Sequence, residues 1–163
     1  MFLTNFEIIS LCKSYKVPLD GVLMKNELNF SKHDGNYVIN LDSNDKQGSH
    51  WTALVIRGND YLYFDSFGCV PPTEVETYLG GSKVRYAFNN WICQDLESSN
   101  CGFFCVALFI FLNKHRGSLY DLSNKFINIF QDNTKLNDKA LQKFYIEQKL
   151  NNKIVSKKLL LRK

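Results

Sequence analysis

Apolar residues recur along this chain with two periods, one typical of helices and one typical of strands. Near the N-terminus, Thr4 and Glu7 form a capping-box pattern ahead of apolar residues at helical spacing, which predicts a helix that Pro18 ends. Gly58 and Asn59 separate two apolar runs and predict a tight hairpin turn. Runs rich in β-branched and aromatic residues predict three strands, at residues 36–43, 50–57 and 60–66.

The second half of the chain has mainly helical spacing. A helical stretch begins near Pro72 and ends at Gly80 and Gly81, and a fourth candidate strand follows at residues 83–90. Residues 101–115 are apolar on nearly every face, as expected of a helix that passes through a core. Two further helices are expected, at residues 118–130 and 137–150. This order of elements predicts an α+β domain with a small antiparallel sheet.

Composition supports a folded protein of one domain. The chain of 163 residues is 45% hydrophobic and 14% aromatic, so we expect a single domain over residues 1–163 rather than a disordered chain. The longest apolar run, residues 101–112, is too short to span a bilayer, and no secretory signal is visible at the N-terminus. Five cysteines without a regular framework favour a reduced, intracellular protein. We expect a monomer that is neither secreted nor associated with a membrane.

The net charge of +4 is concentrated at the C-terminus. Residues 149–163 carry six basic side chains and no acidic one, so the rest of the chain has 14 basic residues against 16 acidic ones. Binding of DNA is therefore expected, if at all, from this basic tail. A solvated helix end with a frayed terminus explains the same residues equally well.

Three residue types with a role in nucleophilic acyl chemistry occur in the order His50, Asp65, Cys101. His50 begins one predicted strand and Asp65 ends the next. Because the two strands form a hairpin, these two ends lie at the same edge of the sheet, where an imidazole and a carboxylate can meet. The hairpin is thus predicted to hold an imidazole–carboxylate pair.

Cys101 follows three good N-cap residues and begins the apolar helix. A thiol in the first turn of a helix lies at the positive end of the helix dipole, which favours the thiolate. Gly102 leaves room for a substrate carbonyl to approach, and the Cys101 main-chain N–H can serve as one oxyanion donor. Gln94, seven residues earlier, is expected to supply a second donor from its side-chain amide.

Each of these residues also has an ordinary structural explanation. A cysteine beside Phe103 and Phe104 is usually a packing residue, a histidine in a strand is often structural, and an aspartate before Ser-Phe-Gly commonly forms a turn. The catalytic interpretation is preferred because separate elements deliver all the parts at compatible ends. A zinc site is rejected because the chain contains no C-x-x-C pair.

The motif GSHW, then YLYFDSFG, then Gln-x6-CGFFC resembles the adenovirus-type cysteine proteases. These adenain-like enzymes also occur in virophages and Maverick/Polinton-like DNA elements, and are related to the SUMO and ubiquitin-like-protein proteases. The resemblance implies a papain-like fold, in which a small, mixed, mostly antiparallel sheet packs against helices and the nucleophile begins a buried central helix. It implies His50 as the base, Asp65 as its orienting partner, Cys101 as the nucleophile and Gln94 as the oxyanion donor. Trp51 and Gly102 are expected to contact substrate, with Trp51 beside the imidazole.

The same resemblance implies a cysteine endopeptidase that cleaves capsid or core precursor proteins of a virus or virus-like element during virion maturation, at small-residue sites of the Gly-Gly type. Such an enzyme is expected in the virion, or in the cytoplasm or nucleus of a host cell. No prosthetic group or metal is expected, and activation by DNA or a peptide is left open. The alternatives are an isopeptidase that removes SUMO or ubiquitin, and a non-catalytic relative that binds nucleic acid through its tail.

Overall fold

The computed structural model describes residues 3–160, with the backbone alone for residues 152–160. A five-stranded mixed sheet lies at its centre, in the spatial order β1-β2-β3-β4-β5. The central pairs β2–β3 and β3–β4 are antiparallel, whereas the outer pairs β1–β2 and β4–β5 are parallel. The strands are β1 (Gly21–Met24), β2 (Gly35–Asn40), β3 (Trp51–Arg57), β4 (Asp60–Phe64) and β5 (Ala87–Phe88).

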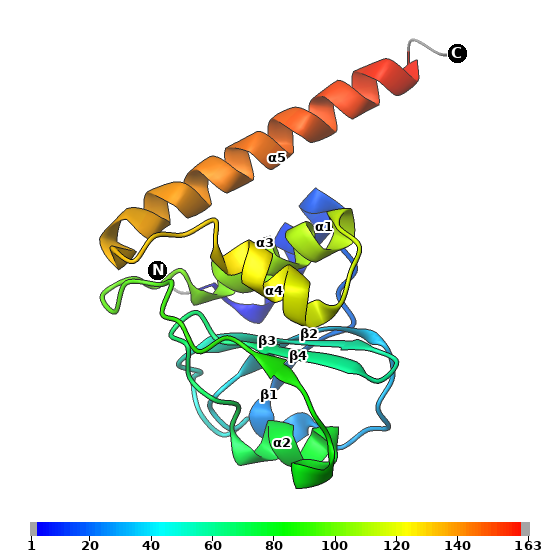
Figure 1. The fold of residues 1–163 in the computed structure, drawn as a ribbon, viewed down its shortest axis with the longest axis vertical. Helices are drawn as coiled ribbons and strands as arrows, with labels where there is room; N and C mark the ends of the chain where they lie inside the picture. The colour runs from blue at the N-terminus through cyan, green and yellow to red at the C-terminus, as the bar shows by residue number, and fades with distance from the viewer. Residues whose placement is uncertain (1–2, 161–163) are drawn as a thin grey trace.

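Helices cover both faces of this sheet. In Figure 1, α1, α3 and α4 lie on one face, α2 lies on the other, and α5 runs along the outer side of the helical layer. The α-helices are α1 (Asn5–Tyr15), α2 (Thr73–Leu79), α3 (Cys101–Lys114), α4 (Leu119–Ile127) and α5 (Asn137–Leu160). Single 3₁₀ turns lie at Lys25–Glu27, Gly81–Lys83 and Thr134–Leu136.

The alternation of side chains along the strands builds two cores. Ala53 and Val55 of β3 belong to the larger core, which they share with α1, α3 and α4. Leu54 and Ile56 point the other way, into a smaller core closed by Val75 of α2. Because both faces of β3 are buried, its sequence is a continuous apolar run rather than an alternating one.

These observations confirm the α+β class and the papain-like arrangement of a mixed sheet with a buried central helix. The capping box of Thr4 and Glu7 begins α1, and Arg57 pairs with Asp60 across the predicted two-residue turn. α3 is the most deeply buried helix, and it packs on β3.

Several sequence predictions of the elements were wrong in detail. The expected strand at residues 83–90 is only the two residues of β5, and it runs parallel to β4 because its chain crosses back through α2. β1 was missed, because a four-residue strand after Pro18 and Gly21 has too little periodicity to stand out. α5 extends to Leu160 rather than to residue 150. The side chains of most of the basic tail lie outside the described residues.

Candidate active site

Cys101 is the first residue of α3, and it is fully buried. Asn100 occupies the N-cap position without a side-chain cap, and its carbonyl accepts the N–H of Phe104 as the first helical hydrogen bond. The N–H groups of the first turn, including that of Cys101, therefore have no partner within the helix. The main-chain N–H of Trp51 donates to the Cys101 sulfur at 3.5 Å, which ties the start of α3 to the start of β3.

His50 and Asp65 meet at the edge of the sheet, as the hairpin predicts. β3 begins one residue after His50, and β4 ends one residue before Asp65. The Nε2 atom of His50 lies 2.7 Å from the Oδ1 atom of Asp65, and both side chains are largely withdrawn from solvent. A carboxylate that holds Nε2 leaves Nδ1 as the ring nitrogen that can exchange a proton with another group.

The other partner of the imidazole is the Cys101 sulfur. Burial by itself lowers the pKa of His50, but hydrogen bonds from the imidazole to Asp65 and to the Cys101 sulfur, with the charges of both groups, outweigh it and raise the pKa to about 9. The imidazole is therefore protonated at neutral pH while it faces a thiol and a carboxylate. A cysteine beside an imidazolium is the arrangement that enzymes with a cysteine nucleophile use.

Phe67 fixes the orientation of this pair, although the sequence interpretation assigned it no role. Its ring stacks on the His50 imidazole with centroids 4.6 Å apart and planes 24° apart. Its main-chain N–H donates to Asp65 Oδ1 at 2.8 Å, the same oxygen that faces the imidazole. The expected aromatic neighbour was Trp51, yet the ring that stacks on His50 is Phe67. The Asp-Ser-Phe spacing of a side-chain-capped turn is the sequence signal that could have revealed it.

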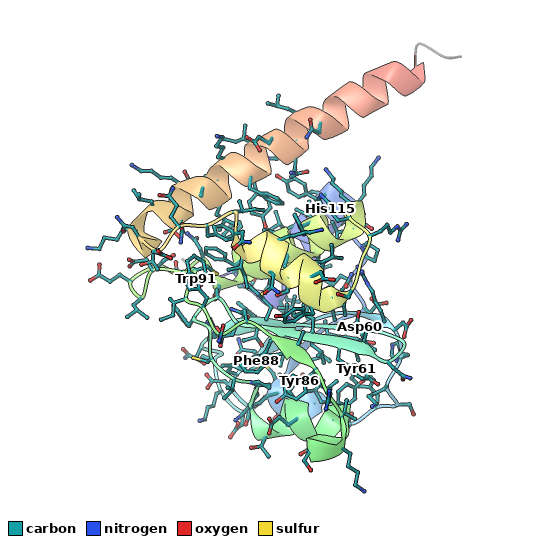
Figure 2. All side chains as sticks on the ribbon, in the orientation of Figure 1. Asp60, Tyr61, Tyr86, Phe88, Trp91 and His115 are labelled. Atoms are coloured by element: carbon teal, nitrogen blue, oxygen red, sulfur yellow. The ribbon has the colours of Figure 1, made fainter. Side chains whose placement is uncertain are left out.

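Asn89 holds the main chain of Asp65, and the sequence interpretation missed it as well. Its Oδ1 accepts the Asp65 N–H at 2.9 Å, and its Nδ2 donates to the Asp65 carbonyl. A further bond from Nδ2 reaches the Trp91 carbonyl at 3.2 Å. Figure 2 labels Phe88 and Trp91, which flank this segment where it leaves the sheet toward the helices. An asparagine after a strand looks like an ordinary turn residue in sequence, so no signal distinguished it.

Gly68 allows the turn after Asp65 to close against the segment that follows Asn89. Its φ of 70° lies in the left-handed region, and a Cβ atom at this position would lie about 3 Å from the main chain of Trp91. The glycine of the Asp-Ser-Phe-Gly motif therefore has a steric requirement, and it brings the two segments around the carboxylate together.

Gln94 lies in the loop that leads into α3, and its side chain is buried. Its Oε1 accepts from the Ser66 hydroxyl at 2.6 Å, and its Nε2 donates to the Ser98 carbonyl at 2.7 Å. A primary amide has two N–H donors, so this arrangement leaves one for a developing oxyanion. The structure thus orients the amide rigidly, and its role as an oxyanion donor stays a prediction.

Trp51 and Gly102, the two expected substrate contacts, both touch the N-terminal segment. The Trp51 indole N–H donates to the Leu3 carbonyl at 2.7 Å. A Cβ atom built on Gly102 would lie 3.2 Å from the Leu3 side chain and 3.4 Å from the Trp51 ring. The space expected to receive a substrate carbonyl beside Gly102 therefore holds Leu3.

The other four cysteines have surroundings that oppose ionisation. Burial raises the pKa of Cys12 to about 12 and also raises the pKa values of Cys93 and Cys105. Cys69 is exposed, and slight burial together with the Asp65 charge raises the pKa of its thiol. Unlike these four, Cys101 has an imidazole partner that is protonated at neutral pH. Its environment is therefore distinct from that of every other thiol in the chain.

The part of the chain that the structure describes has neither a cluster of metal ligands nor a membrane-spanning helix. In that part of the chain, no three His, Cys, Asp or Glu side chains are grouped so that they could bind a metal ion. None of its helices combines the length and the apolar character that crossing a membrane requires.

No family model and no curated protein matches this sequence. Among solved structures, the crystal structure of ASFV pS273R protease superposes with a TM-score of 0.52 at 18% identity, over 88% of this chain and 65% of that one. The selenomethionine form of that protease superposes with a TM-score of 0.51 at 18% identity, over 88% of this chain and 66% of that one. The structure of AvrA with IP6 and CoA superposes with a TM-score of 0.45 at 17% identity, over 85% of this chain and 53% of that one. This TM-score is too low to establish a shared fold.

The similarity to pS273R establishes the fold and leaves the chemistry to be argued from the site. The present chain spans just under two thirds of the length of that protease. This protein therefore has the fold of a papain-like cysteine protease, with a cysteine, a histidine and an aspartate gathered at the edge of its sheet.

Proposed function

We propose that this protein is a cysteine peptidase in which Cys101 is the nucleophile, His50 the general base and acid, and Asp65 the residue that orients His50. The observation that carries the proposal is the imidazole of His50, which bonds a buried carboxylate through Nε2 and has its pKa raised by that carboxylate and by Cys101 at the start of α3. The likeness of fold to a known protease agrees with it.

The reaction would proceed in two halves. In the reactive form the proton of Cys101 resides on His50, and the thiolate adds to the carbonyl carbon of the scissile bond. The negative oxygen that results is stabilised by the Cys101 N–H and the Gln94 amide. His50 then returns its proton to the leaving amine, which departs as the C–N bond breaks and a thioester forms. A water molecule, deprotonated by His50, hydrolyses the thioester to a carboxylic acid and the free thiol.

Thiol labelling tests the nucleophile directly. Iodoacetamide at neutral pH is expected to alkylate Cys101 well ahead of the other four cysteines, as measured by peptide mapping in a mass spectrometer. Cys69 is the internal control, because it is the exposed thiol. Equal labelling of all five thiols in the folded protein would count against an activated Cys101.

For the substrate, we propose precursors of viral or virus-like capsid or core proteins, cleaved at Gly-Gly-type sites in the virion or in the host cell. The support is the GSHW to CGFFC motif and a fold neighbour that is a protease of ASFV. Incubation with a Gly-Gly-containing capsid precursor, and in parallel with SUMO and ubiquitin probes, separates this from the isopeptidase alternative. Product termini identified by mass spectrometry would define the cleavage site.

The basic tail is proposed to bind DNA, with or without an effect on catalysis. Residues 149–163 hold six basic side chains. Deletion of residues 157–163 is expected to weaken DNA binding and reduce its salt dependence, while hydrolysis of a short peptide continues. An unchanged salt slope after truncation would mean that the tail is not the contact. A catalytically dead protein that binds DNA would support the non-catalytic alternative.

A further inference from the structure

The N-terminal segment ahead of α1 lies against the two residues that adjoin the proposed catalytic pair. Leu3 accepts the indole N–H of Trp51 through its main-chain carbonyl and packs its side chain where Gly102 has none. Trp51 follows His50 in the chain and Gly102 follows Cys101, so Leu3 contacts the chain neighbour of each member of the pair.

The nucleophile is closed off from solvent in this arrangement. Cys101 has a relative exposure of 0%, and His50 has a side-chain exposure of 12%. A substrate carbonyl must come into contact with the sulfur before a bond can form. Something near the sulfur must therefore move before catalysis, and Leu3 is one nearby residue that belongs to no helix or strand.

Leu3 and Trp51 also line a cavity of about 540 Å³. One wall is the edge strand β1, another is the segment before β3, and the N-terminal segment closes it near Trp51. A volume of this size is typical of a site that holds a ligand. The residues that form its walls come from three parts of the chain, at 3–5, 22–24 and 46–51.

The wall formed by β1 offers main-chain groups to a peptide. The Met24 N–H bonds the Glu27 side chain, so the main chain of Met24 faces away from β2. Because peptide groups alternate along a strand, the N–H and carbonyl of Val22 face the same free edge. An extended segment can pair with such an edge, as peptides do in β-augmentation.

We propose that Leu3 is a built-in competitor that occupies the inner end of the substrate groove. This inference rests on the proposed peptidase function. An extended polypeptide substrate would enter along β1, place a main-chain carbonyl on the Trp51 indole N–H and lie over Gly102, as Leu3 does. Displacement of Leu3 would then open the path to the Cys101 sulfur.

The segment can leave without unfolding α1. The capping box between Thr4 and Glu7 begins the helix after Leu3, and Ile8 and Cys12 anchor the helix in the core. The contacts that must break are therefore one hydrogen bond and the packing of one partly buried side chain.

The test compares two truncations of side chains in the same segment. Leu3→Ala removes the side chain over Gly102, whereas Phe6→Ala removes a side chain that is 75% exposed and serves as the matched control. The loss of a partly buried leucine contact is expected to raise the rate of Cys101 alkylation by iodoacetamide about five-fold. The KM for a Gly-Gly peptide is expected to fall by a similar factor at nearly constant kcat. Phe6→Ala and the conservative Leu3→Met are expected to match the wild type in both readouts.

The two readouts separate this inference from the proposed function. If Leu3→Ala is alkylated faster but hydrolyses no peptide, the role of Leu3 as a competitor is supported and the peptidase function is contradicted. If Leu3→Ala hydrolyses a peptide but has the alkylation rate and KM of the wild type, the role of Leu3 as a competitor is contradicted and the peptidase function is supported. Thermal unfolding of each variant checks that the fold is intact, and a Leu3→Met protein that behaves like Leu3→Ala would also overturn the inference.

Discussion

The two ends of the β3–β4 hairpin are built from the same pair of strands, yet they differ in almost every physical respect. At one end, Gly58 and Asn59 are exposed, and a side chain added at Gly58 would meet nothing within 4 Å. At the other end, His50 and Asp65 are withdrawn from solvent and bonded to each other. The first end requires only a local backbone shape, whereas the second requires contacts from β5, α3 and the loop between them.

The difference shows where this fold places groups that are costly to bury. Asp65 is 1% exposed, and its Oδ2 atom has no hydrogen-bond partner among the described residues. A buried carboxylate without full pairing destabilises a protein, and such groups are concentrated at functional sites. Nothing comparable occurs at the Gly58 end. The end proposed to be catalytic therefore carries a cost of burial that the turn end does not, and substitutions at the two ends should separate activity from stability.

Cys101→Ser should cause the largest loss of activity. A serine hydroxyl lacks the nucleophilicity of a thiolate, so kcat/KM for a peptide should fall at least about 10⁴-fold. The change is nearly isosteric, and unfolding monitored by circular dichroism should stay close to wild type. Residual hydrolysis within ten-fold of the wild-type rate would exclude Cys101 as the nucleophile.

Asp65→Asn should have the next largest effect, through the imidazole. Loss of the carboxylate should lower kcat/KM about 10³-fold or more, as for other orienting carboxylates. Because Asp65, together with Cys101, raises the pKa of His50 to about 9, the alkaline limb of the pH–rate profile should move toward neutral pH in the variant. An unchanged alkaline limb would show that Asp65 does not act on His50.

The same pKa shift predicts how stability depends on pH. The raised pKa of His50 means that the folded state binds its proton more tightly than the unfolded chain does, whose value is 6.5. This contribution to the free energy of unfolding is fully present below pH 6.5 and is lost as the pH rises through about 9. In Asp65→Asn, denaturant unfolding between these pH values should show a flatter profile than in the wild type.

Asn89→Ala should have a smaller effect, because it changes the surroundings of Asp65 without removing a group proposed to react. The Asp65 N–H loses its acceptor, so stability should fall by about 2 kcal/mol. A displaced Asp65 should also lower kcat about ten-fold and shift the alkaline limb downward while KM stays constant. Asn90→Ala, one residue along and exposed, is the matched control. A loss of stability with an unchanged pH profile would mean that Asn89 is structural only.

Gly58→Ala, in the turn at the other end of the hairpin, should give the smallest effect. Its φ of 59° lies in the left-handed region, so an alanine should cost about 1 kcal/mol of stability. Activity at a temperature well below unfolding should equal that of the wild type. A drop in kcat/KM comparable to that of Asn89→Ala would show that the two ends are coupled through the strands.

The sequence was informative where a signal is local. Helical spacing and the capping box located α1, and the Gly58-Asn59 pair located the hairpin. Knowledge that strands of a hairpin bring their outer ends together was enough to expect that His50 and Asp65 meet. By contrast, β1 and the short β5 were missed or misjudged, because their strand character depends on partners rather than on their own periodicity.

By itself, the sequence determined most of the helices, the β3–β4 hairpin and the candidate site residues, because periodicity, capping and turn preference act between residues a few positions apart. Only the tertiary structure decided which groups surround the catalytic pair. Asn89 on the Asp65 main chain and Leu3 beside Gly102 depend on packing between distant segments. Such contacts are selected by the shape and polarity of the whole fold, and no local pattern in the chain records them.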